Sequence, residues 1–174
     1  VLDGMDTSTF LLYADEEIVE KTVSVNPGVV AMDAPLALPK GRTSLEERNG
    51  VHLRQCDKEL RKMGIKFFPV TLGPMRKLTE RGIRLRKNLQ ERGLEVIETY
   101  PGAAQDLLRM PRKQHGLAEL RKALENLGVK WLDDSMTGDE LDAVTCALVG
   151  KMYLEGNHIA VGDPAEILMI LPKP

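Results

Sequence analysis

The chain has 174 residues, a length that suits one domain with a sizeable core, and no apolar run reaches the length of a membrane span. Hydrophobic residues make up 43% and charged residues 29%, which is typical of a soluble globular protein. Only 4% are aromatic, which argues against nucleic-acid binding on an aromatic platform. The two cysteines, Cys56 and Cys146, form neither a disulfide framework nor a zinc spacing, so we expect a cytoplasmic protein.

The net charge is only −2, but it is distributed unevenly. Residues 40–92 hold 15 Lys and Arg against 6 Asp and Glu, whereas the rest of the chain holds 9 basic and 20 acidic residues. A segment this basic predicts a surface for an anionic partner, and it could also cover a site as a lid. The alternative is a pair of amphipathic helices whose charges are simply solvated.

The first third of the chain predicts a hairpin, then a helix, then a buried strand. Residues 8–14 read as a strand, with residues 1–3 as its hairpin partner. A short helix is expected over 15–25, where three acidic residues stand at its positive end. The continuous apolar run 28–34 is of the kind that is buried in parallel sheets.

The basic region predicts two helices. The first is expected over 49–63. Pro74 at a first helical position and Gly93 just past the end bracket the second. A strand over 94–99 follows, ending in Tyr100-Pro-Gly.

The last third predicts helices over 116–128 and 138–155 and a closing apolar strand over 167–171. Because strands alternate with helices along the chain, we expect an α/β fold. No linker or internal repeat interrupts the pattern, so residues 1–174 are expected to form a single domain.

Asp33 ends the apolar run Val29-Val-Ala-Met32 and precedes Ala34-Pro35. Ligands of open α/β sheets bind just outside the carboxyl ends of the strands, so an acid here is well placed to hold a metal. The alternative is a capping or turn aspartate. We favour a functional acid, because the apolar flanks offer no partner for its charge.

Three further acids are candidates for the same site. Asp139 and Asp142 are three residues apart, so they share one face of the 138–155 helix. Asp139 has a strong structural alternative, because Thr137 and Glu140 form a capping box and acids are common in a first turn. Asp142 lies beyond that turn in an apolar helix and is the sharper candidate. Glu98 ends the 94–99 strand as Asp33 ends its own, and an edge salt bridge is its alternative.

Several motifs together resemble one family, domain of unknown function 429, whose members are predicted nucleases of the ribonuclease H-like superfamily. In chain order these motifs are residues 31–36, 54–65, 98–102, 111–117, 139–143, 147–150 and 162–164. The resemblance implies a mixed central sheet flanked by helices, with an antiparallel meander first and parallel strands after it. It also implies Mg²⁺ or Mn²⁺ bound by Asp33, Asp139 and Asp142, with Glu98 as a ligand or a residue that orients water.

Members of that family open with a strand that ends in Gly-Ile-Asp-Leu-Ala, whose aspartate belongs to the metal site. This sequence begins after that strand, so we expect the domain to be N-terminally incomplete. A sheet interior left unpaired would associate, and a homodimer is then one expected outcome.

Three basic residues match the family pattern: Arg54, Arg112 and Lys113. They are expected to contact substrate phosphates, because arginine suits bidentate phosphate recognition. The alternative is that they form ion pairs with Asp57 or with the clustered acids themselves.

The expected function is therefore metal-dependent hydrolysis of nucleic-acid phosphodiester bonds, without a membrane partner. Two alternatives stay open: a non-catalytic module that binds nucleic acid or a nucleotide, and a small-molecule phosphohydrolase that uses the same pocket.

Overall fold

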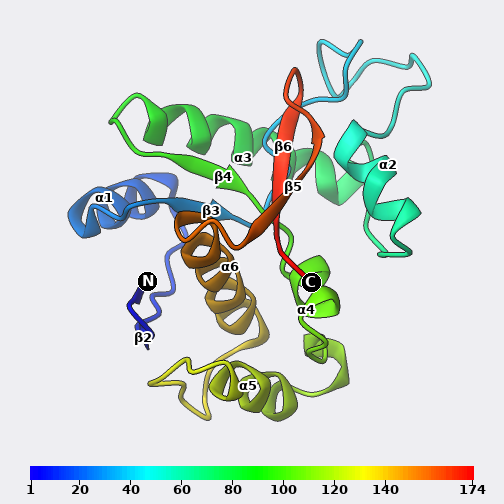
Figure 1. Ribbon diagram of the computed structural model, residues 1–174. Helices are drawn as coiled ribbons and strands as arrows, with labels where there is room; N and C mark the ends of the chain where they lie inside the picture. The colour runs from blue at the N-terminus through cyan, green and yellow to red at the C-terminus, as the bar shows by residue number, and fades with distance from the viewer.

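The computed structural model describes residues 1–174 as one α/β unit (Figure 1). The helices are α1 Asp15–Val25, α2 Gln55–Lys62, α3 Gly73–Gln90, α4 Pro101–Leu107, α5 Leu117–Asn126 and α6 Gly138–Leu154, with a 3-10 turn η1 at Lys113–His115. The strands are β1 Leu2–Asp3, β2 Asp6–Thr7, β3 Val30–Met32, β4 Val96–Glu98, β5 His158–Asp163 and β6 Ile167–Pro172. None of the helices combines the length and apolar character that crossing a membrane requires.

The main sheet is mixed and has the strand order β3-β4-β6-β5. β3, β4 and β6 run parallel, and β5 returns antiparallel beside β6 as the hairpin drawn in red and orange (Figure 1). This confirms the expected α/β class with a mixed sheet. The antiparallel meander implied for the start of the chain is limited to the two-residue strands β1 and β2, which pair apart from the main sheet.

Helices cover both faces of the sheet because neighbouring strand residues point to opposite sides. Val96 and Ile97 of β4 belong to different core clusters. The first cluster joins β4 and β6 to α1 and α3 through Val19, Leu85, Leu89 and Ile167. The second joins them to α4 and α6 through Ala104, Val149 and Ile170. α6 passes close to β3, since a Cβ at Gly150 would lie 3.2 Å from Val29 Cγ1.

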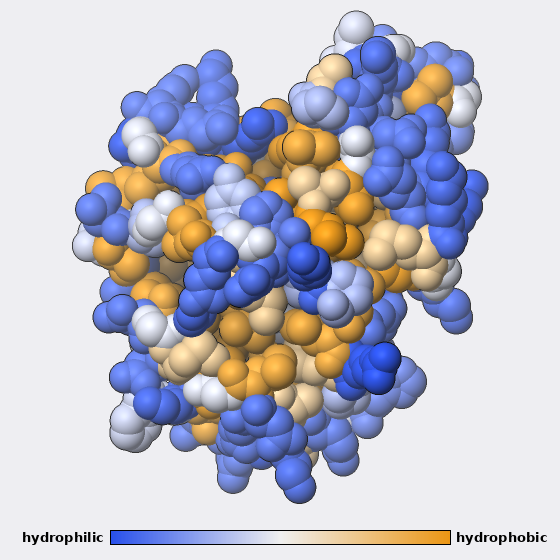
Figure 2. All heavy atoms as spheres, viewed as in Figure 1, coloured by the Kyte–Doolittle hydropathy of each residue, from blue (hydrophilic) through white to orange (hydrophobic).

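Apolar side chains also reach the surface. Figure 2 shows them across the middle of the molecule, between hydrophilic residues over α5 below and over α2 at the right. Phe68 is among the most exposed, with 68% of its surface accessible. Scattered apolar residues on a surface are ordinary, but a grouped set can mark a binding site.

The strand expected over 8–14 does not form. Of residues 8–14 only Ser8 pairs, exchanging backbone hydrogen bonds with Val1 at 2.9 and 3.1 Å, and β2 ends at Thr7. Thr9 instead donates a hydrogen bond to the Glu140 carboxylate of α6 (2.7 Å), and Phe10 is 48% exposed. An extended segment without a partner has no ladder to join, so its β propensity alone does not make it a strand.

The helix expected over 49–63 begins only at Gln55. The preceding loop is organised by the buried Arg42, whose guanidinium donates to the carbonyl oxygens of Ser44, Leu45, Glu47 and Val51. These contacts hold residues 42–51 in a loop, and Val51 is the one of the four acceptors that lies within the expected helix 49–63. The helix α4 and the strand β5 are additions that the sequence pattern did not predict.

Gly82 lets α3 approach the segment that follows Asp33. A Cβ at this position would lie 2.9 Å from the Pro35 carbonyl oxygen and 3.0 Å from Ala34 Cβ. We expect Gly82→Ala to lower the free energy of unfolding by about 1–3 kcal/mol, the cost of overpacking, although alanine is intrinsically the better helix former. Gly73→Ala on the same helix, where a Cβ meets nothing within 4 Å, is the control. Urea unfolding of both variants measures the difference, and a Gly82→Ala protein as stable as the parent would contradict the close packing.

Candidate active site

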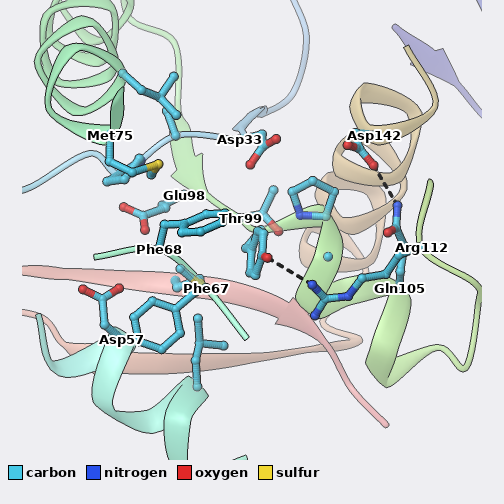
Figure 3. A pocket seen from close by; sticks show the side chains of 18 of the residues that line it. Asp33, Asp57, Phe67, Phe68, Met75, Glu98, Thr99, Gln105, Arg112 and Asp142 are labelled. Carbon is cyan, nitrogen blue, oxygen red and sulfur yellow. Dashed lines mark hydrogen bonds between the residues drawn. The ribbon is translucent and has the colours of Figure 1, made fainter. Parts of the chain in front are cut away.

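A cleft of about 310 Å³ opens at the carboxyl ends of β3 and β4 (Figure 3). Asp33, Glu98 and Thr99 line it where the two strands end. α2, the extended segment 65–72, α3, the start of α4, η1 and α6 supply its walls. The sheet therefore brings together side chains that lie more than 100 residues apart in sequence, such as Asp33 and Asp142.

Asp33 follows directly after β3. Met32 is in register with Glu98, and the Thr99 N–H donates to the Met32 carbonyl (3.0 Å), so Asp33 and Thr99 continue side by side. By its accessible surface Asp33 is exposed to water at the cleft, although protein atoms are dense around its carboxyl group. Burial, followed by the charges of Asp142, Asp139 and Glu98, raises its pKa to about 7, against the opposing pull of Lys113.

Asp142 is a buried acid on α6, with 8% of its surface accessible. Its Oδ1 accepts a hydrogen bond from Gln105 Nε2 of α4 at 2.9 Å, as the dashed line in Figure 3 shows. Its Oδ2 lies 2.8 Å from Lys113 Nζ. Gln105 is itself buried and also donates to Thr145 Oγ1 (3.3 Å). The carboxylate is thus held in one orientation by α4 and faces the cleft.

Asp139 is not among the residues that line the cleft, and its side chain is 90% exposed. The capping box expected between Thr137 and Glu140 is confirmed by reciprocal hydrogen bonds. Lys113 Nζ lies 2.7 Å from Asp139 Oδ1 and so bridges Asp139 and Asp142. Partial burial opposes the charge of Lys113, but the hydrogen bonds to both acids outweigh it and raise the Lys113 pKa.

Glu98 lies under the wall of the cleft and is 1% exposed. Its Oε2 accepts from Arg54 Nη1 and from the Leu36 N–H, both at 2.7 Å. Arg54, 2% exposed, also contacts Asp57, with 2.9 Å between Nη2 and Oδ1. The ion pair with Asp57 given above as the alternative for Arg54 is confirmed. Glu98 thereby anchors the loop after β3, since it binds the Leu36 backbone.

The sequence over residues 5–167 matches one family, described as "Protein of unknown function (DUF429)". The chain belongs to the DUF429 family. No curated protein and no solved structure matches it.

Arg112 lines the cleft of this DUF429 protein but is not free of partners. Its Nε and Nη2 donate to the Asp106 carboxylate at 2.9 and 2.5 Å. Its Nη1 donates to the Tyr100 hydroxyl (3.2 Å), and its guanidinium carbon lies 5.7 Å from the Tyr100 ring centroid. Ion pairs thus occupy all three basic residues expected to contact phosphate, Lys113 included.

Part of the basic segment 40–92 has a structural role in this DUF429 chain. Arg81 and Arg84 of α3 both pair with Asp15 of α1, at 2.6 and 2.9 Å. Arg42 and Arg54 are buried within the protein. The uneven charge therefore reflects internal ion pairs as well as surface cations. Both cysteines are free and buried, in agreement with the absence of a disulfide framework.

The acidic side chains at the cleft of this DUF429 protein are of the chemical type that binds a hard divalent cation. Asp33, Asp139 and Asp142 offer carboxylate oxygens, which Mg²⁺ and Mn²⁺ prefer. The charges of Asp142, Asp139 and Glu98 add to the effect of burial in raising the pKa of Asp33, against the opposing charge of Lys113. Asp33 and Asp142 line the cleft, Asp139 does not, and the three acids do not stand as a ready-made metal-binding group. The Lys113 ammonium pairs with both Asp139 and Asp142. A cation would therefore have to displace Lys113.

The cleft residues that were not predicted from sequence include Phe67, Phe68, Thr99, Tyr100 and Gln105. The helix α4, which carries Gln105, could have been predicted, because Pro101 stands at a first helical position and two alanines follow. The Thr99 hydroxyl is buried without a hydrogen-bond partner, and nothing in its sequence neighbourhood signals that.

Proposed function

We propose that this DUF429 protein is a metal-dependent hydrolase of nucleic-acid phosphodiester bonds with a ribonuclease H-like fold. The arrangement of acids supports the fold assignment: Asp33 follows β3, Glu98 ends the neighbouring parallel strand β4, and two more acids stand on the late helix α6. The observation that carries the activity is that Asp33 and Asp142 line the same cleft. Burial, and after it the charges of Asp142, Asp139 and Glu98, raise the Asp33 pKa to about 7, and a bound cation would relieve the repulsion between these acids.

Asp33 and Asp142 would hold the cation, with Asp139 joining them once Lys113 has moved. A bound Mg²⁺ or Mn²⁺ would supply an activated water and stabilise the oxygen that leaves the phosphorus. Gln105 holds the Asp142 carboxylate in place from α4, and the Thr99 hydroxyl is free to donate a hydrogen bond. Since Asp33 is substantially protonated near neutral pH, it must release that proton when the cation binds, so binding should strengthen as pH rises through 7.

The test is metal-induced stabilisation together with cleavage of labelled DNA and RNA oligonucleotides, single- and double-stranded, in Mn²⁺ and in Mg²⁺. At a cation concentration about 100-fold above Kd, linkage predicts about 2.7 kcal/mol of stabilisation, which raises Tm by about 5 °C or more. We expect Asp142→Asn to lose both the stabilisation and the cleavage. Asp134→Asn is the matched control, because Asp134 is 93% exposed and pairs with Arg121 outside the cleft.

Each alternative has a distinct outcome in this assay. Hydrolysis of nucleotides or simple phosphate esters, with every oligonucleotide left intact, would replace the nuclease with a small-molecule phosphohydrolase. Stabilisation by manganese that Asp142→Asn retains in full would remove Asp142 from the metal site.

A non-catalytic nucleic-acid-binding or nucleotide-binding module is the second candidate. The contact that favours it is Lys113, which neutralises Asp139 and Asp142 without a metal. Oligonucleotide binding that is unaffected by divalent cations, with no turnover, would support this candidate.

A further inference from the structure

Aromatic side chains gather at the cleft although the chain contains few of them. Phe67, Phe68 and Tyr100 line its wall, together with Met75 and Leu78 of α3. Figure 3 shows Phe67 and Phe68 on the side of the cleft that faces Asp33 and Asp142. Phe68 keeps 68% of its surface accessible, so a large apolar ring stands open beside charged groups. Scarcity of aromatics in the composition therefore does not describe their local density at this site.

The segment that carries Phe67 and Phe68 is anchored on both sides. Ile65 and Val70 are buried, at 6% and 1% exposure, and they flank the two rings. The Tyr100 hydroxyl donates to the Lys66 carbonyl (2.9 Å) and so ties the segment to the start of α4. The exposure of Phe68 is thus fixed by the fold, since the backbone around it is held in place.

The cleft also holds one polar group that lacks a partner within the protein. The Thr99 hydroxyl belongs to a residue that is 2% exposed, lines the cleft and makes no hydrogen bond. Buried hydroxyls normally have a partner, so this one has hydrogen-bonding capacity left for a ligand. Lys113 and Arg112 line the same cleft, but each is paired with acids of the protein. A ligand that fits these features has a flat apolar part and hydrogen-bonding edges, and its negative charge would be met by the cation of the proposed function.

We propose that the cleft takes one unstacked nucleobase of a single-stranded nucleic acid, which stacks on Phe68 while its phosphate lies toward the carboxylates. This rests on the proposed function and specifies its substrate. A cleft of about 310 Å³ has room for a single nucleotide unit. Bases within a duplex stack on one another, so an aromatic side chain can reach only a base in a single strand or one turned out of the helix.

Variants of Phe68 test the stacking directly. Binding of labelled single-stranded DNA and RNA is measured by fluorescence anisotropy in Ca²⁺, with strand integrity checked on a gel. Stacking on an aromatic residue predicts that Phe68→Ala weakens binding by about 5-fold to 150-fold. Phe68→Leu should lose a similar factor, and Phe68→Trp should restore binding. Phe10→Ala is the matched control, because Phe10 is a half-exposed phenylalanine outside the cleft, where it contacts Lys21.

Two results would overturn the inference. One is single-strand binding by Phe68→Ala equal to that of the parent protein. The other is full binding by Phe68→Leu, which would show an apolar contact without stacking. Cleavage in Mn²⁺ is scored separately, so the two proposals can fail independently. Duplex cleavage that is indifferent to Phe68 would leave the nuclease standing and remove the nucleobase pocket, whereas binding that depends on Phe68 without any cleavage would do the reverse.

Discussion

Arg54→Met is expected to lower the free energy of unfolding by about 3–5 kcal/mol, the cost of breaking a buried ion pair by removing one partner. Arg54 is 2% exposed and stands between Asp57 and Glu98, which are almost equally inaccessible to water. Its loss would leave two carboxylates buried without a cation. It would also free the Glu98 oxygen that fixes the Leu36 backbone, so the loop after Asp33 should loosen.

Urea unfolding at pH 7.5 measures this loss, with Arg61→Met on the same helix as the exposed control. The size of the loss should depend on pH. Burial already raises the pKa of Glu98, against the opposing charge of Arg54. Without Arg54 the carboxyl would bind a proton more readily, so the variant should regain stability as pH falls. Adding Glu98→Gln should recover part of the loss. A deficit below about 1 kcal/mol would contradict a buried network of this kind.

Asp33→Asn is expected to change activity and stability in opposite directions. Cleavage should fall by about 100- to 1000-fold, because a ligand of the proposed metal supplies several kcal/mol of transition-state stabilisation. In the metal-free protein the same change should raise stability, because it removes a carboxylate that its neighbours repel. Function and stability would then be opposed at this one position, as is common in active sites.

The sign follows from the raised pKa of Asp33. The Asp33 carboxyl has a pKa of about 7 in the folded protein and 3.8 as its ordinary value, which we take for the unfolded chain. At a pH between these two values, the folded protein therefore binds more protons at Asp33 than the unfolded chain does. Its presence therefore lowers stability progressively as pH rises from about 4 to about 7, and the effect is constant above that. We expect Asp33→Asn to gain on the order of 1 kcal/mol at pH 8, an amount discounted because water reaches the side chain.

Thermal unfolding of metal-free protein at pH 5 and pH 8 gives the measurement, with Asp134→Asn as the control. The gain in Tm should be about 2–4 °C at pH 8 and smaller at pH 5. An Asp33→Asn protein that is less stable than the parent at pH 8 would show that the carboxylate is already compensated. A gain that is equal at both pH values would point to a cause other than ionisation.

The elements that the sequence predicts well are those with strong local signals. The helix over 15–25 has the predicted boundaries, and α3, α5 and α6 lie within about two residues of theirs. Pro74, Gly93 and the Thr137 capping box mark ends that local chemistry decides. The prediction of a strand over 8–14 was wrong, because a segment with β propensity becomes a strand only when another strand pairs with it. The helix start at 49 was wrong because Arg42 holds the preceding loop from within the fold.

The sequence by itself determined the α/β class and the family, and it singled out two acids that line the cleft, Asp33 and Asp142. These rest on local features: apolar periodicity, an acid at the end of an apolar run, and an acid within an apolar helix. Only the tertiary structure decided which of the charged residues already form ion pairs within the protein. Arg54 is buried between two acids, Lys113 bridges Asp139 and Asp142, and Arg112 binds Asp106.

The tertiary structure also decided where the aromatic residues meet. Phe67 and Phe68 come from the segment before α3, and Tyr100 comes from the end of β4, more than 30 residues away. Composition counts such residues but carries no information on their distances, because contacts between distant parts of the chain depend on how the sheet and its helices pack. The same packing sets the pKa of Asp33, because burial raises it most and the charges that add to the rise come from β4 and α6.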